Sequence, residues 1–126
     1  MIFDSDVMIW AFRGNRRALK AIDEADARAI SSVTYMELLQ GVRNKDEMRE
    51  MKRFLSKLSF STLPITANIS NRAVAILEET ALKSDLGVCD ALIFATACET
   101  GETLLSGNKK HPREVPLLNA VEFKPE

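Results

Sequence analysis

The chain has 126 residues, of which 46% are apolar and 28% are charged, and its formal net charge is −1. This length fits one domain over residues 1–126, and the composition excludes a disordered or polycationic chain. No apolar run is long enough to span a membrane, and the N-terminus lacks the pattern of a signal peptide, so we expect a cytoplasmic protein without a membrane partner.

Apolar periodicity and turn residues predict strands that alternate with helices. The expected strands are residues 2–3, 29–33, 60–65, 103–106 and 121–123. The expected helices are residues 7–12, 16–25, 34–39, 45–58, a long helix that follows the N-cap Thr66, and 88–98. Pro64 favours an edge position for the third strand. The alternation predicts an α/β fold in which helices flank a mostly parallel sheet.

The two cysteines, Cys89 and Cys98, fall on nearly opposite sides of the last expected helix, so they cannot form a disulfide bond with each other. Their spacing matches no zinc-binding pattern. We therefore expect both to be small buried residues of a protein from a reducing compartment.

Three acidic residues stand where apolar residues would be expected. Asp4 closes an apolar run at the N-terminus, Glu37 is set within residues 33–39, and Asp90 heads residues 91–95. A carboxylate among core residues is costly to bury unless it is paired, hydrogen-bonded or bound to a metal. Because open α/β sheets place ligands beyond the carboxyl ends of their strands, we expect one cleft to collect all three.

Each of these acidic residues also has a local explanation. Thr34 and Glu37 have the spacing of a capping box, and Asp90 is favoured near a helix N-terminus by the helix dipole. Asp4 can end the strand or cap the helix expected at Val7. Capping does not require all three residues to fall beside strand ends, so together they favour a shared cation.

Oxygen ligands without accompanying histidine or cysteine favour Mg²⁺ or Mn²⁺. Such an ion can orient water and neutralise charge on a phosphodiester. The only histidine, His111, is predicted to be an exposed loop residue. Cationic residues follow each acidic segment and either surround a phosphodiester site or form an ordinary solvated surface. They are Arg13, Arg16, Arg17 and Lys20, then Arg43 and Lys45, then Lys109, Lys110 and Arg113.

Four segments resemble the PIN-domain ribonucleases, and among them the VapC-type toxins of toxin–antitoxin pairs. They are IFDSDV at residues 2–7, TYMELLQG at 34–41, GVCDALIFATA at 87–97 and LLSGNKKH at 104–111. The resemblance covers nearly the whole chain and implies a PIN-like three-layer sandwich. It also implies that Asp4, Glu37 and Asp90 are catalytic residues that hold Mg²⁺ or Mn²⁺.

The resemblance further implies cleavage of an RNA substrate, a homodimer, and inhibition by a cognate antitoxin that inserts a basic side chain into the acidic site. The expected RNA contacts are Arg13, Arg43, Lys109 and Lys110. One candidate surface for the antitoxin is the helix at residues 45–58, whose apolar stripe otherwise belongs to the core. That stripe consists of Met48, Met51, Leu55 and Leu58.

The chain departs from the family pattern at three positions. Asn108 stands where an aspartate is frequent, which makes the site less anionic and a second metal less secure. Asp6 stands where a small hydroxyl residue is frequent and would be an outer carboxylate that partly offsets Asn108. Pro112 replaces an aromatic residue that often follows His111.

Three other functions fit parts of the sequence. The segment FDSDV also looks like the first motif of haloacid-dehalogenase-type phosphatases, but no late acidic pair follows the strand at 103–106. A phospho-acceptor receiver module would need an aspartate at the end of a central strand, and the candidate strand at 60–65 ends at Thr66. A catalytically inactive PIN-like scaffold is favoured only by Asn108.

Overall fold

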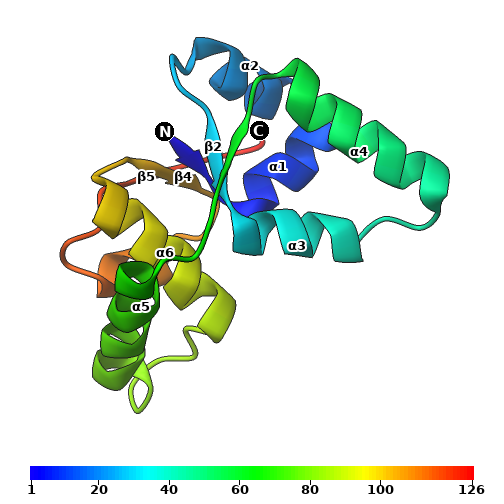
Figure 1. The fold of residues 1–126 in the computed structure, drawn as a ribbon. Coiled ribbons are helices and arrows are strands. Elements are labelled where there is room, and N and C mark those ends of the chain that lie inside the picture. Colours follow the sequence, from blue (N-terminus) through cyan, green and yellow to red (C-terminus); the bar gives the residue numbers. More distant parts are fainter.

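The computed structural model describes all 126 residues as a five-stranded sheet with helices on both faces (Figure 1). The strand order is β3-β2-β1-β4-β5, and every neighbouring pair is parallel. The predicted α/β sandwich is therefore confirmed, and its sheet is wholly parallel. The strands are β1 (Ile2–Phe3), β2 (Ala29–Ser31), β3 (Ser61–Leu63), β4 (Leu104–Ser106) and β5 (Ala120–Glu122).

The helices follow the expected order closely. They are α1 (Ser5–Phe12), α2 (Arg16–Glu24), α3 (Ser32–Gln40), α4 (Lys45–Lys57), α5 (Ala67–Thr80), α6 (Val88–Thr100) and the 3₁₀ helix η1 (His111–Glu114). The longest, α5, has 14 residues, and no helix combines the length and apolar character that crossing a bilayer requires. Gly101 ends α6 in the left-handed conformation, at φ 69°, which costs glycine less than other residues.

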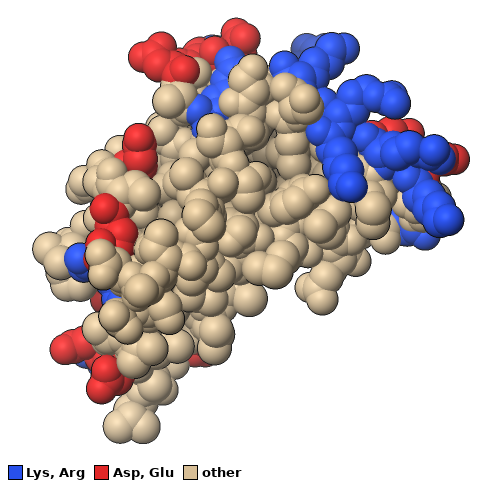
Figure 2. All heavy atoms as spheres, in the orientation of Figure 1, with Lys and Arg blue, Asp and Glu red and all other residues tan.

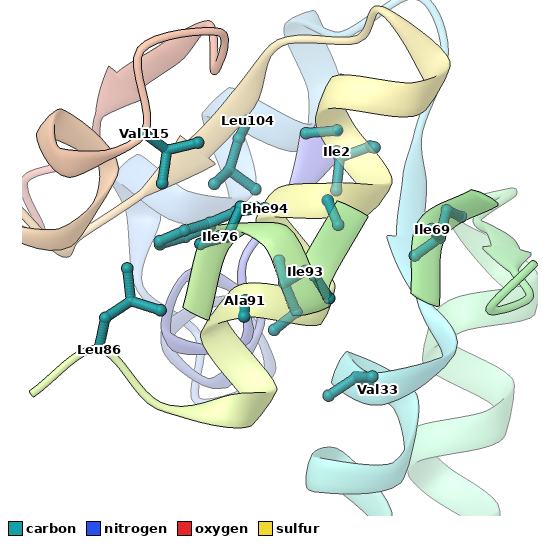
Figure 3. Packing of buried hydrophobic residues seen from close by; sticks show 13 residues of the cluster. Ile2, Val33, Ile69, Ile76, Leu86, Ala91, Ile93, Phe94, Leu104 and Val115 are labelled. Carbon is teal, nitrogen blue, oxygen red and sulfur yellow. The ribbon is translucent and has the colours of Figure 1, made fainter. Parts of the chain in front are cut away.

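The two faces of the sheet carry separate cores, and alternate residues of the central strands point into them. Ile2 and Leu104 join a cluster with α5 and α6 (Figure 3), whereas Phe3 and Leu105 join a cluster with α1, α2 and α4. Phe94 of α6 is fully buried among the first group. Burial of each large side chain contributes roughly 1.5–3 kcal/mol. The two cores hold β1 and β4 rigidly, and the site lies at the ends of these strands.

Helix α3 begins at Ser32 and not at Thr34. The hydroxyl of Ser31 caps it by accepting a hydrogen bond from Val33 N at 3.1 Å. The capping box predicted from Thr34 and Glu37 is therefore wrong. Because the helix starts earlier, Glu37 lies beyond its first turn and its carboxylate is not used to cap the backbone.

Candidate active site

Asp4 lies at the junction of the central strands with helix α1. It directly follows β1, it caps α1 by accepting a hydrogen bond from Ser5 N at 2.8 Å, and only 7% of its surface is exposed. Its second carboxylate oxygen accepts a hydrogen bond from the hydroxyl of Ser106 at 2.7 Å. Ser106 ends β4, the strand that pairs with β1, so the parallel register brings these two strand ends together.

Burial raises the pKa of Asp4 to about 6. The hydrogen bond from Ser106 opposes this increase, whereas the negative charges of Asp6 and Asp90 add to it. Asp4, Asp6 and Asp90 therefore share one electrostatic environment. None of the three carboxylates is paired with a lysine or arginine.

Glu37 is connected to the same place through a hydroxyl group. The Oγ atom of Ser5 donates to Glu37 Oε1 at 2.6 Å and also lies 3.1 Å from the hydroxyl of Thr34. Ser5 is the neighbour of Asp4, so the start of α1 and the middle of α3 meet beside the buried carboxylate. The sequence analysis missed Ser5 as a site residue, and its position between Asp4 and Asp6 was the available signal.

Asp6 is held by backbone donors. Its two oxygens accept hydrogen bonds from Val7 N at 2.8 Å and from Gly107 N at 2.9 Å. Burial raises the pKa of Asp6, and the charge of Asp90 raises it further against the effect of these hydrogen bonds. Gly107, which the sequence analysis also missed, is needed here because a Cβ atom at this position would overlap the carboxylate of Asp6.

We expect Gly107→Ala to displace Asp6, lower stability by about 1–3 kcal/mol and reduce activity, because the new methyl group and the Asp6 carboxylate occupy the same space. Urea unfolding measures the loss. The double variant Gly107→Ala/Asp6→Ala should recover most of it. Gly41→Ala is a suitable control, since a Cβ atom there meets only backbone oxygens, the nearest at 3.5 Å. Equal stability of Gly107→Ala and wild type would contradict this geometry.

Asn108 is engaged within its own loop. Its amide oxygen accepts hydrogen bonds from Lys110 N and His111 N, each at 3.1 Å, and these backbone donors fix the orientation of the amide. The amide nitrogen therefore faces Nδ1 of His111, at 2.9 Å. Because its amide oxygen accepts both of these backbone hydrogen bonds, Asn108 supports the loop that follows β4.

His111 is not the exposed residue that the sequence predicted, because only 14% of its side chain is exposed. Its Nε2 atom lies 2.7 Å from the carboxylate of Asp85, and its Nδ1 atom lies 3.5 Å from that of Asp90. The hydrogen bond with His111 and a second from Lys110 lower the pKa of Asp85 to about 2. His111 thus joins the loop before α6, the first turn of α6 and the loop after β4.

The predicted RNA-contacting residues differ in their partners. Lys109 pairs with Glu122 at 3.5 Å, and Lys110 pairs with Asp85 at 3.1 Å. Arg13 and Arg43 both line a cleft of about 530 Å³ between α1, α3 and α4, and Glu37 lines the same cleft. The rest of the cleft includes Glu47, which pairs with Arg43 at 3.1 Å, and the apolar residues Ile9, Phe12, Leu38 and Met51.

Cys89 is exposed, so the prediction that it is buried is wrong, whereas Cys98 is half-buried; both thiols are free. Partial burial raises the pKa of the Cys89 thiol, and the nearby charges of Glu37 and Asp90 raise it further. Cys89 therefore lies on the rim of the acidic site. The nearness of Glu37 and Asp90 to one thiol also places these two carboxylates on the same side of the molecule.

The donors available to a metal ion are carboxylate oxygens, which suit Mg²⁺ or Mn²⁺. As the side chains stand, no three acidic, histidine or cysteine residues are placed so that they could hold a metal ion together. Mg²⁺ keeps several waters and binds through one or two protein carboxylates beside a substrate phosphate, so it does not require such a group. The residues present therefore fit a solvated Mg²⁺ or Mn²⁺ ion.

Comparison with known proteins gives a consistent picture. Residues 1–115 match the family model described as the PIN domain. A chain of a toxin–antitoxin complex from Klebsiella pneumoniae is 30% identical with a TM-score of 0.77, and the match covers 99% of this chain and 97% of that one. None of the curated proteins matches the chain in sequence.

Two further structures share the fold at lower identity. One is VapBC2 from Rickettsia felis bound to a DNA fragment from its promoter, with a TM-score of 0.83, 21% identity and coverage of 98% of this chain and 100% of that one. The other is DNA-bound VapBC from Salmonella typhimurium, with a TM-score of 0.81, 19% identity and coverage of 96% of each chain.

Proposed function

Because the chain belongs to the PIN-domain family, we propose that it is a Mg²⁺- or Mn²⁺-dependent ribonuclease and the VapC-type toxin of a toxin–antitoxin pair. The observation that carries the proposal is the set of carboxylates at the ends of β1 and β4, with no lysine or arginine paired to them. Buried like charges without a counter-ion are unfavourable, and a divalent cation is the partner that this arrangement lacks.

Asp4, Glu37 and Asp90 would hold the ion, with Asp6 in an outer position and Asn108 supporting the adjacent loop. When bound, the ion would supply positive charge against the scissile phosphate and lower the pKa of water. The surrounding residues prepare the ligands for this role. Ser106 favours the ionised form of Asp4, and Ser5 orients Glu37. His111 lies against Asp90 and limits its movement.

We further propose which partners the protein binds and how it is assembled. We expect a cognate antitoxin, because the 30% identical chain belongs to a toxin–antitoxin complex. We also propose a homodimer, a cytoplasmic location and one PIN-like domain over residues 1–126. Among the proposed RNA contacts, Arg13 and Arg43 line the same cleft as Glu37.

Cleavage of RNA by the purified protein tests the proposal. We expect cleavage with Mg²⁺ or Mn²⁺, loss of cleavage with EDTA, and a decrease of at least about 10³-fold in Asp90→Asn and Glu37→Gln, because each change removes a charged ligand. The exposed Asp26→Asn is the matched control. Full metal-dependent activity of Asp90→Ala would reject the assignment, and growth arrest by wild type but not by Asp4→Asn would test the toxin role.

A further inference from the structure

Some cationic side chains of the protein form salt bridges with acidic residues, and others have no acidic partner. Those near α5, α6 and the C-terminus are paired: Arg72 with Glu99 at 2.6 Å, Lys109 and Lys124 with Glu122 at 3.5 and 3.9 Å, and Lys110 with Asp85 at 3.1 Å. Lys83 and Arg113 are the exceptions in this half of the chain. Paired cations contribute little net attraction for an anionic ligand.

The first half of the chain carries a group of exposed cations without acidic partners, which we call the α2–α4 basic surface. Figure 2 shows lysine and arginine side chains gathered over α4 and the neighbouring ends of α1 and α2. Its unpaired members are Arg13, Arg16, Arg17, Lys45, Lys52, Arg53 and Lys57. On α4, Arg53 lies on the face opposite the buried Met51 and Leu55, and Lys45 and Lys52 lie together at the side of the helix. The chain as a whole has a net charge of only −1, so this surface is a local concentration of positive charge.

The cleft between α1, α3 and α4 connects this surface with the acidic site. Leu38 and Met51 are almost fully buried and form its apolar floor, whereas the Arg43 side chain is 84% exposed at its edge. Glu37 lies at one side of the cleft, and Met51 belongs to the same helix as the unpaired lysines. The cleft thus brings together a proposed metal ligand, an apolar floor and the unpaired Arg13, and Met51 joins it to the helix that carries Lys52 and Arg53.

We propose that single-stranded RNA follows a path over this cleft and helix, with one base in the cleft beside Glu37 and the phosphates of the adjoining nucleotides on the α2–α4 basic surface. The proposal rests on the proposed ribonuclease function. A nucleotide combines a flat, largely apolar base with an anionic phosphate, and the path offers a matching apolar floor and unpaired cations in that order. The cleft lies within the roughly 300–1,000 Å³ range of small-ligand sites, which accommodates one base.

Binding of a short fluorescent RNA in EDTA tests the basic surface without cleavage. Lys52→Ala/Arg53→Ala should weaken binding about 5–20-fold near 0.1 M salt. It should also reduce the slope of log K against log salt by about 1.4, since each lost phosphate contact on a single strand removes about 0.7. The matched control is Lys83→Ala/Arg113→Ala, which removes two exposed unpaired cations outside the surface and should leave the slope unchanged. Equal slopes for both double variants would overturn the proposal.

Gly41→Phe tests the cleft. Gly41 lines it at φ −83°, a conformation open to any residue, so a large side chain there fills the cleft without backbone strain. We expect an unchanged melting temperature, at least a tenfold lower kcat/KM for RNA and an altered base preference, with Gly41→Ala close to wild type. Unchanged RNA binding and base preference in Gly41→Phe, with loss of inhibition by the antitoxin alone, would instead make the cleft a protein-docking site and overturn the proposal.

These outcomes separate the path from the proposed function. RNA binding that depends on Lys52 and Arg53, without cleavage by wild type in Mg²⁺ or Mn²⁺, would retain the path and reject the nuclease. Metal-dependent cleavage that is insensitive to the surface variants and to Gly41→Phe would retain the nuclease and reject the path.

Discussion

Asp4→Asn should make the metal-free protein more stable at neutral pH and at the same time abolish its RNA cleavage. The pKa of Asp4 is raised from 3.8 to about 6 by burial, so the folded state is less stable when this carboxylate is charged. Asparagine keeps the size and an oxygen acceptor for Ser5 N but has no charge to bury. It also cannot supply the negative charge that a divalent ion requires, so we expect cleavage to fall at least about 10³-fold.

The sign of the pH dependence follows from proton binding. Between pH 4 and pH 6 the folded protein holds a proton on Asp4 that the unfolded chain has lost, so the wild type loses stability as pH rises through this window. The full difference of about two units corresponds to roughly 3 kcal/mol. Asp4→Asn should therefore match wild type near pH 3.5 and exceed it by roughly 2–3 kcal/mol above pH 6.

Urea unfolding in EDTA at several pH values measures this difference. Asp23→Asn, on the exposed face of α2, is the matched control and should change stability by less than about 0.5 kcal/mol. Addition of Mn²⁺ should raise the melting temperature of wild type but not of Asp4→Asn. A destabilised Asp4→Asn protein at pH 7 would mean that Asp4 is stabilised by interactions other than those described.

Ser106→Ala should weaken metal binding about 10–100-fold at pH 7, although Ser106 itself would touch no ion. The Ser106 hydroxyl is 1% exposed and donates to Asp4 at 2.7 Å, and its loss removes a hydrogen bond that lowers the pKa of Asp4. A hydrogen bond to a charged group contributes about 1.5–3 kcal/mol, which is one to two pKa units. The variant should therefore need a higher pH before Asp4 is ionised.

Mn²⁺ titrations followed by melting temperature, at pH 6.5 and pH 8.5, measure this effect. The deficit of Ser106→Ala should be large at the lower pH and shrink at the higher pH. Ser56→Ala, on the exposed face of α4, is the control and should bind Mn²⁺ like wild type at both values. A deficit that does not change with pH would show that Ser106 acts by shaping the loop through Asn108 N and not through the charge of Asp4.

The order of strands and helices could be predicted because local sequence patterns indicate each element. The paired apolar residues Ile2-Phe3 and Leu104-Leu105 indicate strands buried on both faces, and cap residues such as Thr66 mark helix starts. The start of α3 could not be predicted in this way. Ser31 and Thr34 have the same capping chemistry, and the pairing of Ser31 with Leu63 of β3 sets where the strand ends.

The acidic members of the site were predictable because charge among apolar residues is conspicuous in a sequence. Their neutral supports were not. Ser106 and Gly107 contact Asp4 and Asp6 only through the register of β4 against β1, which no local pattern states. The burial of His111 likewise depends on Asp85, which belongs to a different loop.

The pairing of β1 with β4 has a consequence for the synthesis of the protein. Ile2 leaves the ribosome long before its strand partner Leu104, which lies far along the chain. Ser106 and Gly107, which contact Asp4 and Asp6, are therefore synthesised long after these two residues. Such long-range parallel contacts form slowly. We expect the site of a growing chain to stay incomplete until Ser106 and Gly107 have emerged, so that the proposed nuclease would not act on the ribosome that translates it.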